Sequence, residues 1–61
     1  MCELAVYLLE NGKEEILMED VANIKPNGDR LVLVDLLGRQ QIVAARIREL
    51  KLLEHKVFLE K

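Results

Sequence analysis

Short apolar runs separated by regularly placed turn signals make up most of the chain, and this pattern predicts strands. The clearest signal is Asn11-Gly12, because both central residues of a tight hairpin turn need a positive φ. Such a turn pairs the residues on either side of it: Glu10 with Lys13, Tyr7 with Ile16, and Val6 with Leu17. The result is an ion pair at the tip with apolar pairs below it, which favours a hairpin.

Four further reversals are expected, at residues 19–20, 27–28, 37–38 and 54–55. The second Asn-Gly pair occupies 27–28, and Gly38 follows a predicted type I turn, where a left-handed residue is common. A two-residue turn at 54–55 would place Leu52 opposite Val57 and Leu50 opposite Leu59. Those four apolar side chains would then share one face of a hairpin.

A helix over residues 40–53 is the chief alternative to this strand pattern. Val43, Ile47 and Leu50 recur there at helical spacing among good helix formers. No Ser, Thr, Asp or Asn precedes Gln40 to cap such a helix, and the whole chain lacks Ser and Thr. We therefore predict an all-β fold: one domain over residues 1–61, forming a small antiparallel β-barrel similar in kind to the Src-homology-3 barrel, with about five to seven short strands.

Composition changes this picture in one respect, the state of association. The chain has 61 residues, of which 51% are hydrophobic, and a net charge of −2. A chain this short cannot cover so many apolar side chains, so we expect a homodimer. The sequence shows no long apolar run, signal peptide or basic amphipathic stretch, and its lone thiol suits a reducing compartment, so we expect a cytoplasmic protein that does not enter a membrane.

Cys2, the only cysteine, is the main candidate for chemistry. It lies beside the amino end of the chain, so its sulfur and a nitrogen donor can chelate one ion. If Met1 is removed, the donors are the Cys2 amine and thiolate. If Met1 stays, its amine, the Cys2 amide nitrogen and the thiolate can form fused rings. Such donors suit Ni(II) or Cu(II) better than Mg(II) or Ca(II). The alternative is a free cysteine that packs as a small hydrophobe.

Other candidate residues fit structural roles better than chemical ones. His55 is expected in an exposed turn without converging partners, Glu19-Asp20 in a solvated turn, and Met18 in the core. The chain has no phosphate-binding glycine loop, carboxylate dyad, or serine or threonine nucleophile, so we expect it not to be an enzyme.

A second functional hypothesis rests on basic residues. Arg46 and Arg48 alternate along one predicted strand and, with Arg39 and Lys51, form the best candidate for an RNA-binding or protein-binding face. Single-stranded RNA usually also needs aromatic platforms for its bases, and the chain has only two aromatic residues, Tyr7 and Phe58.

The chain resembles the CooT family of small nickel-binding proteins, whose members have also been catalogued as predicted RNA-binding proteins. Five segments carry the resemblance: Met1-Cys2-Glu3, residues 17–21, residues 28–31, residues 35–38 and residues 47–60. It implies a compact β-barrel homodimer that binds one Ni(II) through Cys2, as a metallochaperone-like accessory protein. It also implies a nickel-enzyme acceptor such as carbon monoxide dehydrogenase.

Overall fold

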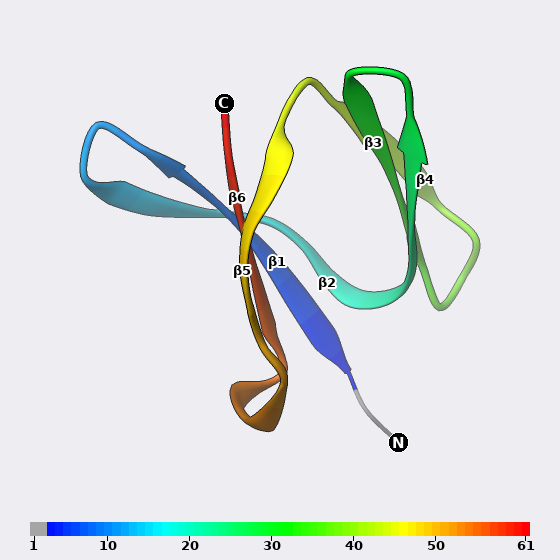
Figure 1. Cartoon of the computed structure of the whole chain (residues 1–61). Coiled ribbons are helices and arrows are strands. Elements are labelled where there is room, and N and C mark those ends of the chain that lie inside the picture. The colour runs from blue at the N-terminus through cyan, green and yellow to red at the C-terminus, as the bar shows by residue number, and fades with distance from the viewer. Residues whose placement is uncertain (1–2) are drawn as a thin grey trace.

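The computed structural model describes residues 3–61, and most of them belong to strands (Figure 1). The elements are β1 (Leu4–Glu10), β2 (Lys13–Asn27), β3 (Arg30–Asp35), β4 (Gln40–Val43), β5 (Arg46–Lys51), the 3₁₀ turn η1 (Leu52–Glu54) and β6 (Lys56–Glu60). The predicted all-β class is confirmed. The alternative helix over residues 40–53 does not form, because that segment contributes β4, β5 and the 3₁₀ turn instead.

The six strands form one mixed sheet in the order β4-β3-β2-β1-β6-β5. Neighbouring strands are antiparallel except β1 and β6, which run parallel from Ala5 opposite Lys56 to Leu9 opposite Glu60. The prediction of a purely antiparallel sheet is therefore wrong. The turn signals in the sequence specify local hairpins, whereas the β1–β6 pair joins the two ends of the chain.

The two edges of this sheet, β4 and β5, are consecutive in the chain. Only Ala44 and Ala45 separate them, so the sheet must roll until its edges approach each other at this connection. Ala45 is part of the core. Within residues 3–61 no strand pairing joins β4 to β5, so the sheet is rolled but closure into a barrel is not seen.

Two predicted turns are confirmed. Asn11 and Gly12 both have positive φ, with Glu10 opposite Lys13 and Tyr7 opposite Ile16. A bulge then shifts the register, so Val6 faces Met18 and not Leu17 as predicted. Gly38 has φ 84° at the β3–β4 turn, as expected.

The other three predicted turns are corrected. At 19–20 the chain does not reverse: Asp20, with φ 54°, bends β2, so that the strand pairs first with β1 and then with β3. The β2–β3 turn uses residues 28–29, because Asn27 pairs with Arg30. At 54–55 the loop spans residues 52–55, so Leu50 faces Val57.

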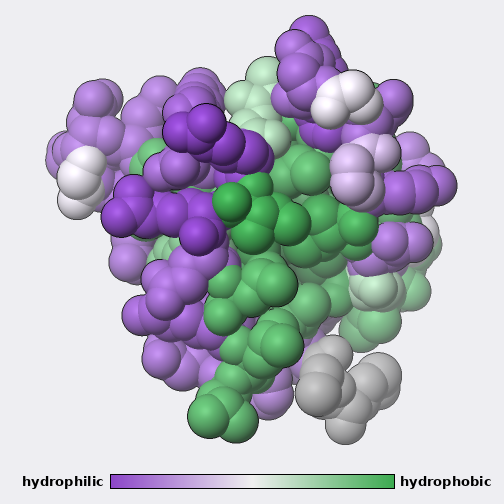
Figure 2. Space-filling model, in the orientation of Figure 1, coloured by the Kyte–Doolittle hydropathy of each residue, from purple (hydrophilic) through white to green (hydrophobic). Residues whose placement is uncertain are grey.

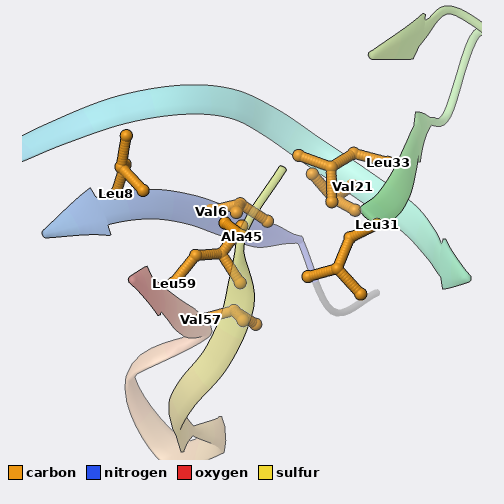
Figure 3. Packing of buried hydrophobic residues seen from close by; sticks show 8 residues of the cluster. All are labelled: Val6, Leu8, Val21, Leu31, Leu33, Ala45, Val57 and Leu59. Carbon is orange, nitrogen blue, oxygen red and sulfur yellow. The ribbon is translucent and has the colours of Figure 1, made fainter. Parts of the chain in front are cut away.

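The core lies on the inner face of the rolled sheet (Figure 3). Its eight buried members come from four strands and the β4–β5 connection: Val6, Leu8, Val21, Leu31, Leu33, Ala45, Val57 and Leu59. Burying an aliphatic side chain of this size contributes about 1.5 to 3 kcal/mol. Met18 packs against this core, as predicted.

Candidate functional site

Cys2, the predicted metal ligand, lies outside the described residues, and β1 is the first described strand that follows it in the sequence. This strand begins at Leu4, and the backbone N–H of Ala5 donates to the carbonyl oxygen of His55 over 2.9 Å. The parallel pairing with β6 begins at the same point, with Ala5 opposite Lys56. The start of β1 is therefore fixed against the 52–55 loop.

His55 ends this loop in the left-handed conformation, with φ 57° and ψ 43°. Its backbone N–H donates to the carbonyl oxygen of Leu52 over 3.1 Å, and the residue is exposed. The prediction of an exposed turn histidine is confirmed. Beside it, Lys56 Nζ lies 3.8 Å from Glu54 Oε1 in an exposed ion pair.

Within residues 3–61, the structure brings no three His, Cys, Asp or Glu side chains together in a way that could hold a metal ion. Glu19 and Asp20 are both exposed on β2, at its bend. The same part of the chain contains no helix long and apolar enough to cross a membrane.

Arg46 and Arg48 share one carboxylate. Arg46 Nε donates to Glu60 Oε2 and Arg48 Nη1 to Glu60 Oε1, each over 3.1 Å. The hydrogen bond from Arg48 lowers the pKa of Glu60, partial burial opposes this, and Arg46 adds to the lowering, so the pKa lies below its ordinary value of 4.5. Because Glu60 stays ionised between the two guanidinium groups, the predicted basic face loses part of its positive charge.

Arg39 and Lys51, the other predicted members of that face, have contacts elsewhere. Arg39 donates to Asp35 in the β3–β4 turn, while Lys51 Nζ lies 5.5 Å from the ring centre of Phe58. The structure therefore does not gather the four cations around one shared group.

The two aromatic rings are already paired with each other and with lysines. Tyr7 and Phe58 stack with ring centres 5.5 Å apart, and Lys56 Nζ lies 5.7 Å from the ring centre of Tyr7. Phe58 is only 5% exposed. Base stacking requires an open ring face, so this pair gives the RNA hypothesis no support.

Asp35, which the sequence marks only as a turn position, is the most connected side chain of the described chain. Its Oδ1 accepts from the backbone N–H of Leu37 and of Arg39 over 2.9 and 2.8 Å, and its Oδ2 accepts from Arg39 Nε over 2.6 Å. Burial raises the pKa of Asp35, but the hydrogen bonds from Arg39 and Leu37 outweigh it and hold the pKa below 3.8. A sequence signal for this role exists, since an Asp side chain often accepts from the backbone two residues on.

A band of apolar side chains runs over β5 and the loop that comes after it (Figure 2). Leu50, Leu52 and Leu53 line a shallow hollow there together with Lys51 and Glu54. Leu53 is fully exposed. This band lies at the loop that contacts the start of β1. The turn pattern predicted Leu50 and Leu52 on one face of a hairpin, but Leu52 lies in the loop and only Leu50 lies in β5.

Comparisons with known proteins agree over almost the whole chain. Residues 1–60 match the family model for "CO dehydrogenase accessory protein CooT". An uncharacterized protein of Methanocaldococcus jannaschii is 35% identical over 60 residues, covering 98% of both chains. The crystal structure of a candidate CooT protein from Carboxydothermus hydrogenoformans superposes with a TM-score of 0.91 at 30% identity, over 98% of this chain and 97% of that one.

Proposed function

Because the chain belongs to the CooT family of CO dehydrogenase accessory proteins, we propose that it carries Ni(II) as cargo, bound through Cys2 where the N-termini of a homodimer meet. Its acceptor would be a nickel enzyme of the carbon monoxide dehydrogenase kind. Cys2 is the ligand assigned, and the backbone hydrogen bond from Ala5 to His55 fixes the start of β1, the strand that follows it in the sequence.

One observation carries this proposal: the family match begins at residue 1 and so includes Cys2. A second is consistent with it. Within residues 3–61 of one chain, no three His, Cys, Asp or Glu side chains come together, so the described strands offer no competing site of that kind within a single chain. Thiolate and amine or amide nitrogen are suited to a square-planar Ni(II) ion.

The donor count explains why two chains are needed. If Met1 is removed, each chain supplies one amine and one thiolate, and two chains complete a plane of four donors. If Met1 stays, the deprotonated amide nitrogen of Cys2 joins the set and one chain supplies most of the plane. Both arrangements need the thiolate of Cys2.

Calorimetric titration with Ni(II) tests the assignment. Cys2→Ser should abolish stoichiometric nickel binding together with the thiolate charge-transfer absorption. His55→Ala is the matched control, because His55 is exposed and lies in the loop beside β1, and it should bind nickel as the parent does. Undiminished binding by Cys2→Ser would refute the proposal, and loss of binding in His55→Ala would move the site to the loop.

The pH dependence provides an independent check. A free thiol has a pKa of about 8.5, so lowering the pH from 8 to 6 reduces the thiolate fraction roughly 75-fold for each ligand. Apparent nickel affinity should therefore fall steeply over this range. Constant affinity between pH 8 and pH 6 would contradict thiolate ligation.

One double variant separates nickel binding from the alternative function, which is RNA or protein binding through Arg46 and Arg48. Neither guanidinium can bind a cation, so Arg46→Ala with Arg48→Ala should leave nickel affinity nearly unchanged. A large loss of nickel affinity in this variant would mean that the site involves β5 directly.

A further inference from the structure

β5 is an edge strand whose two halves differ. Among the strands of residues 3–61 it pairs with β6 alone, and all its residues are exposed. A register shift interrupts the pairing between Ile47 and Glu49, and Arg46 and Arg48 lie in the first half. Bulges and charged side chains protect sheet edges against pairing with other strands. The second half, from Glu49 to Lys51, pairs regularly with β6 and lacks that bulge.

The core-facing side of this second half is apolar and uncovered. Leu50 lies opposite Val57, a core residue that is 1% exposed, yet Leu50 itself is 52% exposed. Leu52 and Leu53 extend the apolar surface into the loop at 60% and 100% exposure. The core thus continues to an open sheet edge, which is typical of a surface that a partner covers.

The charges on the other side of this strand favour a second copy of the same chain. An antiparallel pair of identical strands, related by a two-fold axis perpendicular to the sheet, must place one residue opposite its own copy. With Arg48, Glu49 or Lys51 at the axis, like charges would face each other, which is destabilising. With Leu50 at the axis, Glu49 of each chain faces Lys51 of the other.

We propose that a second copy of this chain covers the edge, with the two β5 strands antiparallel and Leu50 at the two-fold axis. Two Glu49–Lys51 pairs then flank the axis on one face of the sheet, and the leucines of both copies cover each other on the opposite face. The pairing uses the regular half of β5, so the bulged half stays outside the interface.

The functional role of this interface rests on the proposed function. A nickel site that uses two thiolates needs Cys2 from both chains, so it is incomplete without the partner. The start of β1 lies at the same end of the sheet as this half of β5, because Ala5 N–H donates to the carbonyl oxygen of His55. In a dimer through this edge, β6 separates each β1 from β5, and the start of each β1 is level with Lys51, one residue from the two-fold axis.

Charge reversal tests the register in metal-free protein by analytical ultracentrifugation. Glu49→Lys alone, or Lys51→Glu alone, places like charges opposite each other twice, and each should raise the dimer Kd roughly tenfold or more. An equimolar mixture of the two single variants should recover dimers of mixed composition, because both facing pairs are then of opposite sign. The double variant should return to within about threefold of the parent Kd.

Leu50→Glu should also dissociate the dimer, and Ile42→Glu is its matched control. Ile42 is 56% exposed on β4, the opposite edge of the sheet, so its variant should stay dimeric. A monomeric parent at roughly 100 µM, where an interface of ordinary affinity is saturated, would overturn the interface. Single charge variants that dimerise like the parent, or dissociation by Ile42→Glu alone, would overturn it as well.

The two proposals fail in different ways. Cys2→Ser should remain dimeric without metal if the interface is right. If the parent dimerises through β5 but binds no nickel, the assignment of Cys2 as ligand is wrong and the interface stands. If the parent binds nickel but its dimer does not use β5, the interface is wrong and the ligand assignment stands.

Discussion

The β3–β4 and β5–β6 hairpins contain the same three features but place the carboxylate differently relative to the connection. Each has a carboxylate bound to arginine, an exposed pair of adjacent leucines and a left-handed residue in its connection. In β3–β4 the carboxylate, Asp35, is 5% exposed and lies inside the turn. In β5–β6 it is Glu60, at the far end from the loop, where its side chain is 28% exposed.

The consequence is that the Asp35 side chain reinforces the backbone hydrogen bonds of the β3–β4 connection, whereas backbone hydrogen bonds hold the 52–55 loop. Asp35 accepts three hydrogen bonds from residues 37 and 39, so the turn is fixed by its own sequence. The 52–55 loop is held by the backbone bonds from His55 to Leu52 and from Ala5 to His55. The hydrogen bond from Ala5 to His55 therefore fixes the loop against the start of β1, the strand that follows the proposed metal ligand in the sequence.

The largest expected effect is the loss of Asp35. Asp35→Ala leaves the N–H groups of Leu37 and Arg39 and the Arg39 guanidinium without their acceptor, and we expect Tm to fall by roughly 10 °C or more. Glu60→Gln, in the β5–β6 hairpin, should change Tm by about 2 °C or less, since ion pairs with exposed arginines contribute little. Thermal unfolding followed by circular dichroism compares the two. Equal shifts would show that burial does not distinguish the hairpins.

The same contrast should appear in the pH dependence of stability. The pKa of Asp35 is lower in the folded state than its ordinary value of 3.8, so its contribution is fully present above that value and is lost as the pH falls through the folded pKa. The stability difference between the parent and Asp35→Asn should therefore be constant from about pH 7 to pH 5 and shrink below about pH 4. Urea unfolding at a series of pH values measures it. A difference that grows on acidification would contradict the assigned direction.

The turns and strand pairings of the molecule also differ in how far the sequence predicts them. Local signals sufficed for Asn11-Gly12 and for Gly38, because a required positive φ restricts the residue types at those positions. They did not reveal the parallel β1–β6 pair, because the contact joins segments about fifty residues apart and no turn specifies it. The reversal predicted at Asp20 was wrong because a strand that bends by one left-handed residue has the same polar signature as a turn.

The site was predictable to a lesser degree. The exposed position of His55 and the core position of Met18 followed from their neighbours in sequence. The sharing of Glu60 by Arg46 and Arg48 did not, since it depends on the register between β5 and β6. Charge counting along one strand overlooked the carboxylate on the next.

A smaller effect is expected at the left-handed residue of each connection. Gly38→Ala adds a Cβ at φ 84°, with nothing within 4 Å to clash, so the cost is backbone strain of about 1 kcal/mol. His55→Gly relieves similar strain at φ 57° but adds freedom to the unfolded chain, so the free energy of unfolding should stay within about 0.5 kcal/mol of the parent. Denaturant unfolding of both variants at low protein concentration tests this. A loss above about 1 kcal/mol in His55→Gly would mean that the imidazole has a contact of its own.

The smallest effect on the folded monomer is expected at the two leucine pairs, and it separates the hairpins by association alone. Leu37 and Leu53 are 79% and 100% exposed, so Leu37→Ser and Leu53→Ser should each leave Tm unchanged within about 1 °C in dilute solution. In the parent, Tm should rise with protein concentration, because a dimer links folding to association. Leu37→Ser should retain that rise, since its turn lies outside the proposed β5 interface, whereas Leu53→Ser should flatten it. Calorimetric scans from about 10 to 500 µM give the comparison, and a flattened rise in Leu37→Ser with a normal one in Leu53→Ser would assign association to the β3–β4 hairpin instead.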